Sequence, residues 1–338
     1  MPTAITKAPS SFVLPDLVSY CTYPLRINPH LHEQAHLSEQ WLLSGARHKP
    51  KKRVAFMGLK GAALAAACYP DADASRLRVI ADFINYLFNL DDWLDEFDVD
   101  STGSMEECCI GAMRDPINFQ TDTRAGTLTK SFFGRFNLTA GPDCSERFIY
   151  SMQLFFRAAT QQASDRMNND IPDLESYIAC RRDTSACKPC FQLIEYAGGF
   201  ELPEEVLQHP IIQSLEEATN DLVTFSNDVF SYNVEQSRHD THNMVAVMMN
   251  EMGLSLQEAV DLAGDYCKAS VDRFEHDRQL LRSWGPEIDA MVDKYVDGLQ
   301  NWIIGSLHWS FDTERYFGKQ GLEIKRHQVV QLLPKRTK

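Results

Sequence analysis

The spacing of apolar residues is the feature that most restricts how this chain of 338 residues can fold. From Leu37 onward, apolar side chains recur three and four residues apart almost throughout, and the alternation typical of strands is nearly absent. This pattern predicts an all-α protein. The expected helices cover residues 35–48, 52–68, 74–97, 104–114, 126–135, 144–168, 173–184, 186–197, 209–237, 240–250, 255–281 and 287–312.

The breaks between the predicted helices indicate one domain. They carry turn residues, such as Trp284-Gly285-Pro286, and none is long, Ser/Gly-rich or strongly charged enough to be a linker. We therefore expect a single domain over residues 12–316, preceded by a flexible tail at residues 1–11. Residues 317–338 contain six Lys or Arg and one Glu. They are expected to form a solvated basic tail, with a loop that covers an anionic ligand as the open alternative.

The overall charge argues against polyanionic partners. With 33 basic and 47 acidic residues the formal charge is −14, so neither nucleic acid nor an anionic membrane surface is an expected partner for the body of the protein. The N-terminal residues show no basic stretch followed by an apolar run, and the longest apolar runs fall well short of about 18 residues. We therefore expect no secretory signal, no stable membrane insertion and a cytoplasmic protein.

The cysteines are expected to be free thiols. There are nine, an odd number in a long chain without an apparent signal. Cys187 and Cys190 have the spacing of a redox or zinc pair, but no second pair has that spacing and no βαβ pattern surrounds them. They are predicted to be packed thiols.

An acidic stretch ends the mostly apolar run at residues 77–90. Residues 91–96 read Asp-Asp-Trp-Leu-Asp-Glu, and on a helix Asp91 and Asp95 stack on one face. Clustered carboxylates repel one another, and oxygen ligands select a hard cation such as Mg²⁺. A solvated acidic helix end is the alternative. Because Phe88 and its apolar neighbours lie on the same side as Asp91, we favour a metal site at the rim of an apolar surface.

A second polar stripe lies about 130 residues later. Asn227, Ser231 and Glu235 are spaced four apart, so they lie along one side of a helix and can give a hard cation three oxygen ligands. The preceding turns are apolar, as in the first motif. A capped, solvated polar face is the alternative.

Together the two motifs predict a cavity between two helices. Its mouth would bind cations and its walls would be hydrocarbon, a combination that fits an isoprenyl diphosphate. This predicts a helical bundle around a central apolar cavity.

Four sequence elements now identify a resemblance. Residues 91–96 and 227–235 resemble the aspartate-rich and NSE motifs of class I terpene synthases, particularly the single-domain sesquiterpene synthases of fungi, of the basidiomycete type. Residues 181–185, Arg-Arg-Asp-Thr-Ser, resemble the segment that senses diphosphate in that family. Arg315-Tyr316 resembles its C-terminal Arg-Tyr pair. The elements occur in the family's order and span most of the chain.

The resemblance implies roles for individual residues. Three Mg²⁺ ions would be held by Asp91, Asp95, Glu96, Asn227, Ser231 and Glu235. The catalytic residues would be Arg182, which senses the diphosphate, with Arg315 and Tyr316, which donate hydrogen bonds to it. The substrate would also contact Arg181, Ser185, Phe88, Val223, Thr224 and Trp309. Two positions depart from the family pattern, with Val234 in place of a basic residue and Ala186 in place of a glycine.

The resemblance also implies the reaction. We expect an Mg²⁺-dependent sesquiterpene synthase that ionises and cyclises farnesyl diphosphate, with geranyl diphosphate as an alternative substrate, in a monomer or a homodimer. A prenyl diphosphate synthase that elongates chains shares the fold, but it usually has a second Asp-rich motif where this chain has the Asn/Ser/Glu triad. A non-catalytic helical protein that binds an isoprenoid or a metal is the alternative from another class.

Overall fold

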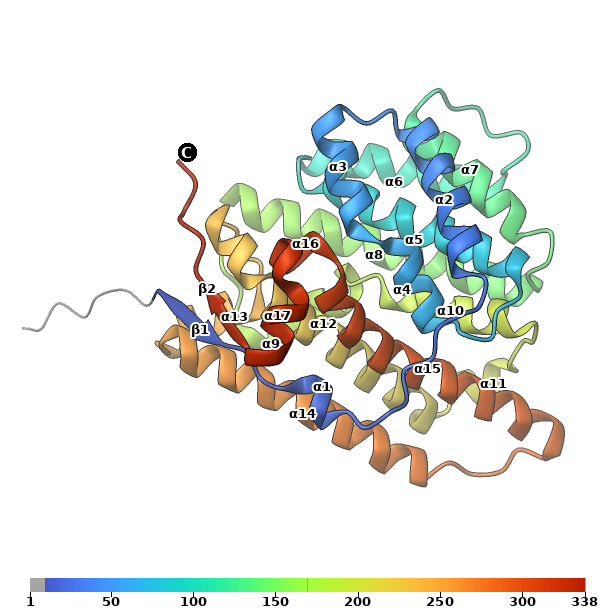
Figure 1. Ribbon diagram of the computed structural model, residues 1–338. Coiled ribbons are helices and arrows are strands. Elements are labelled where there is room, and N and C mark those ends of the chain that lie inside the picture. Colours follow the sequence, from blue (N-terminus) through green and yellow to red (C-terminus); the bar gives the residue numbers. More distant parts are fainter. Residues whose placement is uncertain (1–9, 169, 338) are drawn as a thin grey trace, which may run out of the picture.

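A bundle of helices makes up almost all of the computed structural model, which describes residues 10–168 and 170–337 (Figure 1). The N-terminal helices are α1 (Leu17–Tyr20), α2 (Leu31–Ala46), α3 (Pro50–Leu59), α4 (Gly61–Cys68), α5 (Ala74–Leu94), α6 (Val99–Arg114) and α7 (Arg124–Phe136). The middle of the chain forms α8 (Pro142–Asn168), α9 (Leu174–Thr184), α10 (Cys187–Gly198), α11 (Glu204–Leu207) and α12 (Pro210–Ser237). The last helices are α13 (Met244–Met252), α14 (Leu256–Gln279), α15 (Pro286–Asp312), α16 (Glu314–Phe317), a 3₁₀ turn (Gly318–Gln320) and α17 (Gly321–His327).

The all-α prediction is confirmed, and side-chain caps explain where several of the long helices begin. Asp73 accepts hydrogen bonds from the backbone at the start of α5, and Asp173 does so at the start of α9. Ser255 and Glu258 form a capping box on α14. No helix in the described part of the chain has the length and apolarity needed to cross a membrane.

The predicted helix at 52–68 is wrong in one respect, because the chain breaks at Lys60. This residue takes a left-handed conformation with φ at +56°, and α3 and α4 lie on either side of it. The carbonyl of Lys60 accepts the indole N–H of Trp309 at 3.0 Å, and its Nζ donates to the carbonyl of Asp312 at 2.7 Å. These contacts from α15 hold the break, so local periodicity could not have revealed it.

The C-terminal segment departs from the expected solvated tail. The strand β2 (Val329–Gln331) pairs antiparallel with β1 (Ser11–Val13). Val330 and Ile324 are buried, so the apolar residues among the basic ones decide the conformation here. Of the predicted tail at 1–11, residues 1–9 lie outside the described residues.

Two helices carry the motifs through the core. Along α5 and α12 most side chains are buried, and α12 packs against both α14 and α15. A buried helix must face other helices on several sides, so each can bring polar residues to an interior cavity.

Candidate active site

One pocket collects nearly all the predicted site residues. It encloses about 1270 Å³ of space between its walls, including solvent at its open end. The predicted site residues on its walls are Asp91, Asp95, Asn227, Ser231, Glu235, Arg181, Ser185, Phe88, Val223, Thr224, Trp309, Arg315 and Tyr316. Glu96 and Arg182 are the two predicted residues that do not line it.

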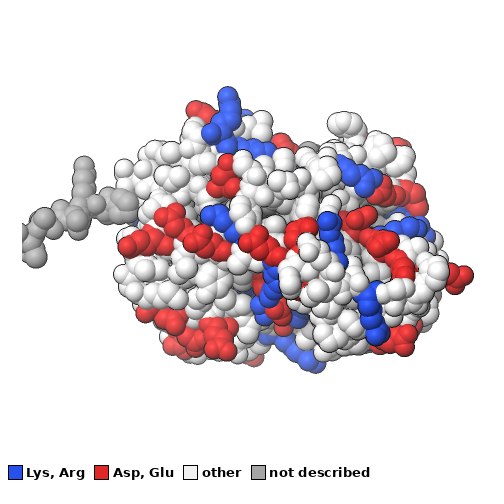
Figure 2. Space-filling view, turned by 90° about the horizontal axis from the view of Figure 1, so that it is seen from below, with Lys and Arg blue, Asp and Glu red and all other residues white. Residues whose placement is uncertain are grey.

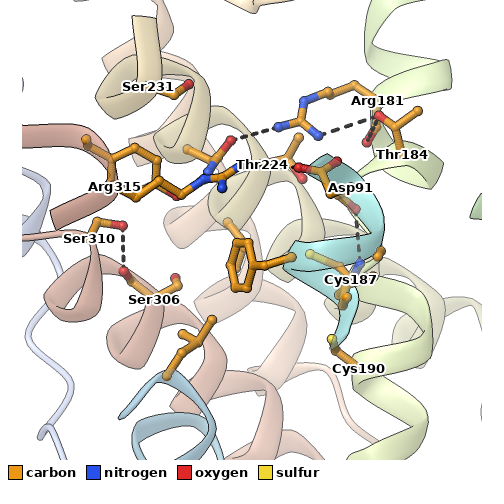
Figure 3. Close-up of a pocket in the computed structure, with 18 of the residues that line it drawn as sticks. Asp91, Arg181, Thr184, Cys187, Cys190, Thr224, Ser231, Ser306, Ser310 and Arg315 are labelled. Atoms are coloured by element: carbon orange, nitrogen blue, oxygen red, sulfur yellow. Dashed lines mark hydrogen bonds and ion pairs between the residues drawn. The ribbon is translucent and has the colours of Figure 1, made fainter. Parts of the chain in front are cut away.

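The pocket has a charged end and a less polar end. Figure 3 shows Asp91, Arg181, Ser231 and Arg315 in the upper half, and Cys187 in the lower half. The lower half also draws on α10 and α15, which pack together. This division matches the expected combination of a cation-binding mouth and a mostly apolar interior.

Asp91 lies at the charged end and is paired with an arginine. Arg315 donates from Nη2 to Oδ2 of Asp91 at 3.1 Å, and its Nη1 is 3.5 Å from Oδ1 of Asp92. The same guanidinium lies over the ring of Phe88, 5.2 Å from its centroid. Arg315 is therefore oriented by two carboxylates and an aromatic face.

The second motif is held by hydrogen bonds at its first and last residues. Asn227 accepts from Nη2 of Arg181 at 2.9 Å and donates from Nδ2 to the hydroxyl of Tyr316 at 2.6 Å. Glu235 accepts from Nδ2 of Asn243 at 2.8 Å. These contacts orient the amide and carboxylate oxygens while leaving other lone pairs free for a ligand.

The structure places the two arginines of the predicted diphosphate-sensing segment differently. It is Arg181 that lines the pocket, where it also pairs with the buried Asp228 at 2.9 Å. Arg182 points elsewhere and makes two hydrogen bonds to the carboxylate of Asp221, at 2.7 and 2.9 Å. Adjacent residues on a helix differ by about 100° in direction, so only one of the two can face the pocket.

The end of the predicted sensing segment also lies at the pocket. Thr184 and Ser185 both line the pocket, and Nη1 of Arg181 lies 3.5 Å from the Thr184 hydroxyl. Ala186 follows in a left-handed conformation, with φ at +55°. This conformation explains why glycine suits the position, because alanine adopts it only at a steric cost.

The prediction that Glu96 is a metal ligand does not fit the geometry. Helix α5 ends at Leu94, two residues before Glu96. The Glu96 side chain is 67% exposed and pairs with Lys52 at 3.1 Å. Its carboxylate therefore points to solvent rather than into the pocket.

The remaining ligand set suits a divalent metal. Burial, with Asp228 and Asp240 nearby, raises the pKa of Glu235 to about 8, and burial beside Asp91 raises the pKa of Asp95 to about 7. A bound cation would stabilise both charged forms.

No group of three or more His, Cys, Asp or Glu in the described part of the chain could hold a metal ion. Amide, hydroxyl and substrate oxygens would therefore have to complete the shell.

These pKa shifts predict a pH-dependent affinity for Mg²⁺. The metal must displace protons from Glu235 and Asp95, which are largely protonated below pH 7, so affinity should rise with pH and level off above about 8. We expect the dissociation constant for Mg²⁺, with inorganic diphosphate present, to fall up to about tenfold per pH unit for each proton released. Calorimetry in buffers of different ionisation enthalpy measures both the dissociation constant and the number of protons released. Glu235→Gln should flatten the dependence and Glu96→Gln should not.

The interior end of the pocket is lined by aromatic rings and thiols. Trp309 packs against Phe88 with ring centroids 5.3 Å apart, and Trp302 lies on the same helix. Cys187 and Cys190 also line the pocket, as buried free thiols, which confirms that no disulfide joins them. Burial raises the pKa of Cys187 to about 11, so it stays a neutral, weakly nucleophilic thiol.

Trp302 and Trp309 lie on α15, which ends at Asp312, whereas Tyr316 belongs to α16. Tyr316 still contacts Trp309, with ring centroids 6.0 Å apart and nearly perpendicular. Phe83, one turn and a half before Phe88 on α5, lies in the core against Phe132 and Phe148 and does not line the pocket.

Several lining residues were not predicted from the sequence. Leu64, Phe155, Gln162, Thr184, Arg238, Asp240, His242, Ser306 and Ser310 belong to this group. Ile84 and Leu87, which also line the pocket, are among the apolar neighbours of Phe88 that the sequence places on the same side as Asp91. Arg238 follows Val234 by four residues, and its presence in the lining supplies a cation near the position where the family has one.

Comparisons with known proteins were consistent with this geometry. Residues 82–273 match the family described as "Terpene synthase family 2, C-terminal metal binding". Sesquiterpene synthase 1 of Postia placenta is 53% identical over 332 residues, covering 98% of this chain and 98% of that protein. Alpha-muurolene synthase of Coprinopsis cinerea is 48% identical over 335 residues, covering 97% of this chain and 79% of that protein.

A solved structure gives the same result for the fold. The crystal structure of germacradien-4-ol synthase from Streptomyces citricolor superimposes with a TM-score of 0.75 at 26% sequence identity. The match covers 86% of this chain and 96% of that one.

Proposed function

The chain belongs to the terpene synthase family, and from that premise we propose that it is a sesquiterpene synthase that ionises and cyclises farnesyl diphosphate. The product would be a cyclic C15 hydrocarbon or alcohol, released with diphosphate. The observation that carries this proposal is that one pocket has carboxylates and arginines at one end and aromatic side chains at the other. The names of the fungal relatives support the substrate class.

We assign the metal-binding role to five side chains. Asp91 and Asp95 on one helix, and Asn227, Ser231 and Glu235 on the other, would hold three Mg²⁺ ions together with the diphosphate. When bound, such ions neutralise the charge that develops on the departing diphosphate.

The cationic side chains would bind and orient the diphosphate. Arg181 and Arg315 are held in place by carboxylates, at 2.9 Å from Asp228 and 3.1 Å from Asp91. Their forked N–H groups suit phosphate oxygens, and Tyr316 adds a hydroxyl donor beside them. When substrate binds, some N–H groups of Arg181 and Arg315 would donate to diphosphate oxygens in place of the carboxylates.

The interior end would fold the hydrocarbon chain and exclude water. Phe88, Trp302 and Trp309 present aromatic faces, which stabilise positive charge by about 2 kcal/mol when desolvated. The neutral thiols of Cys187 and Cys190 add polarizable surface without an ionised nucleophile.

Trp309→Ala is expected to change the product mixture more than it changes the rate of diphosphate release. Removing the indole enlarges the cavity beside Phe88 and also removes the hydrogen bond to the Lys60 carbonyl. Gas chromatography with mass spectrometry reports the products, and a phosphate-coupled assay reports release. Trp309→Phe keeps a ring and should give a smaller change; an unaltered mixture from both variants would remove Trp309 from the cavity wall.

The function itself is tested with purified protein and farnesyl diphosphate, with and without Mg²⁺. We expect cyclic C15 products that disappear without the metal and in Asp91→Ala. Glu96→Ala is the matched control, because it removes a neighbouring carboxylate that points to solvent, and it should retain activity. A longer prenyl diphosphate, formed only when isopentenyl diphosphate is added, would instead identify a chain-elongating enzyme. Absence of turnover with any prenyl diphosphate would favour a binding protein.

A further inference from the structure

A basic segment stands out on this acidic protein. Residues 47–53 read Arg-His-Lys-Pro-Lys-Lys-Arg, without an acidic residue, in a chain whose formal charge is −14. Lys52 pairs with Glu96. Among residues 10–168 and 170–337, Arg47, Lys49, Lys51 and Arg53 form no ion pair, and all four are exposed. Four uncompensated cations within seven residues create a local positive field.

Apolar side chains are exposed on the same segment. Val54 is 72% exposed and Met57 is 43% exposed, whereas Phe56 and Leu59 on the other side of α3 are buried. Cations beside exposed apolar side chains are typical of surfaces that lie in the headgroup region of a bilayer. We call this surface the α3 patch, comprising Arg47, Lys49, Lys51, Arg53, Val54 and Met57.

The α3 patch lies beside the open end of the candidate active site. A second cavity is lined on one side by Val54 of α3 and on the other by Glu235, Arg315 and Tyr316, which also line the main pocket. α3 contacts α16, the helix that carries Arg315 and Tyr316. A surface that docks on the patch would therefore lie next to the entrance.

The opposite side of the molecule differs in charge. In Figure 1, α3 lies at the top and α14 at the bottom of the bundle. Figure 2, seen from that lower side, shows several groups of acidic side chains with Lys and Arg side chains between them. Because the formal charge of the whole chain is −14, the basic α3 patch would be the part that turns toward an anionic surface.

We propose that the α3 patch docks the protein peripherally on an anionic lipid bilayer, with the entrance of the pocket facing the lipid. The placement rests on the proposed function, because a farnesyl chain and a C15 hydrocarbon both partition from water into lipid. The exposed Val54 and Met57 favour a bilayer over nucleic acid, since a polyanion needs only the charges. Docking of this kind adds a local exception to the expectation, based on net charge, that the protein avoids membranes.

The test is flotation of the full chain with phosphatidylcholine vesicles, with and without about one third phosphatidylserine. We expect association only with the anionic vesicles, and weaker association at high salt. Each Lys or Arg near such a surface strengthens binding roughly fivefold, so Lys51→Glu with Arg53→Glu should weaken it at least about twentyfold. Neither residue lines the pocket, so turnover of dissolved substrate should be unchanged.

A matched double variant separates a local patch from net charge. Arg282→Glu with Lys294→Glu makes the same change in charge at exposed positions outside the α3 patch, in the α14–α15 connection and on α15. It should leave vesicle binding intact. An equal loss in both variants, no association with anionic vesicles, or binding to duplex DNA without binding to vesicles would overturn the proposal. Because the readout is flotation, its failure is distinguishable from a lack of catalytic turnover.

Discussion

Arg181→Lys is expected to lower the turnover of farnesyl diphosphate by about 100-fold or more, because lysine cannot reproduce forked donation at the charged end of the pocket. Arg182→Lys is expected to leave turnover within a few fold. Arg181 faces the pocket and reaches Asn227, whereas Arg182 is occupied by Asp221. Steady-state release of diphosphate at saturating Mg²⁺ measures the difference.

Thermal unfolding supplies the control for this pair of variants. Arg182→Lys replaces a bidentate contact to Asp221, a side chain only 5% exposed, so it should lower the free energy of unfolding by about 1–2 kcal/mol. Arg181→Lys also weakens a contact to a buried carboxylate, Asp228, so stability alone cannot separate the two. The two variants are separated by the ratio of the loss of turnover to the loss of stability. Equal losses of turnover in both variants would mean that both arginines, and not Arg181 alone, act on the diphosphate.

The sequence was sufficient to predict the helices and the facing motifs. Four-residue spacing places Asn227, Ser231 and Glu235 on one stripe whatever surrounds them, and the structure keeps that stripe on the pocket wall. Asp91 was equally accessible to prediction, because the apolar face of α5 leads directly to it. Periodicity within one helix carries this information.

Relations between helices were the part that the sequence could not supply. The choice between Arg181 and Arg182 depends on how α9 is rotated against α12, where Asp221 attracts one arginine and Asn227 the other. The position of Glu96 depends on where α5 ends, and the break at Lys60 depends on a contact from Trp309. Each outcome is decided by a partner that is distant along the chain.

Asn227→Ala is expected to reduce cyclisation by about 1,000-fold, the largest effect of a single substitution in this site. The change removes a proposed metal ligand, the acceptor for Arg181 and the donor to Tyr316. Asn227→Asp retains an oxygen for the metal and for Arg181 but loses the N–H group, so we expect a smaller loss, about tenfold. Product formation measured across a range of Mg²⁺ concentrations distinguishes the two variants.

The Asn227 series separates metal binding from the hydrogen-bond network because its members lose different contacts. If the oxygen matters chiefly as a ligand, Asn227→Asp should need no more Mg²⁺ than the unaltered protein, while Asn227→Ala should not recover at any concentration. Asn233→Ala is the control on the same helix, since that side chain contacts the backbone at Gln331 and Leu333 instead of the pocket. It should lower stability but preserve turnover. Equal recovery of both Asn227 variants at high Mg²⁺ would mean that the remaining carboxylates bind the metal without the amide, and the assignment of Asn227 as a ligand would then be wrong.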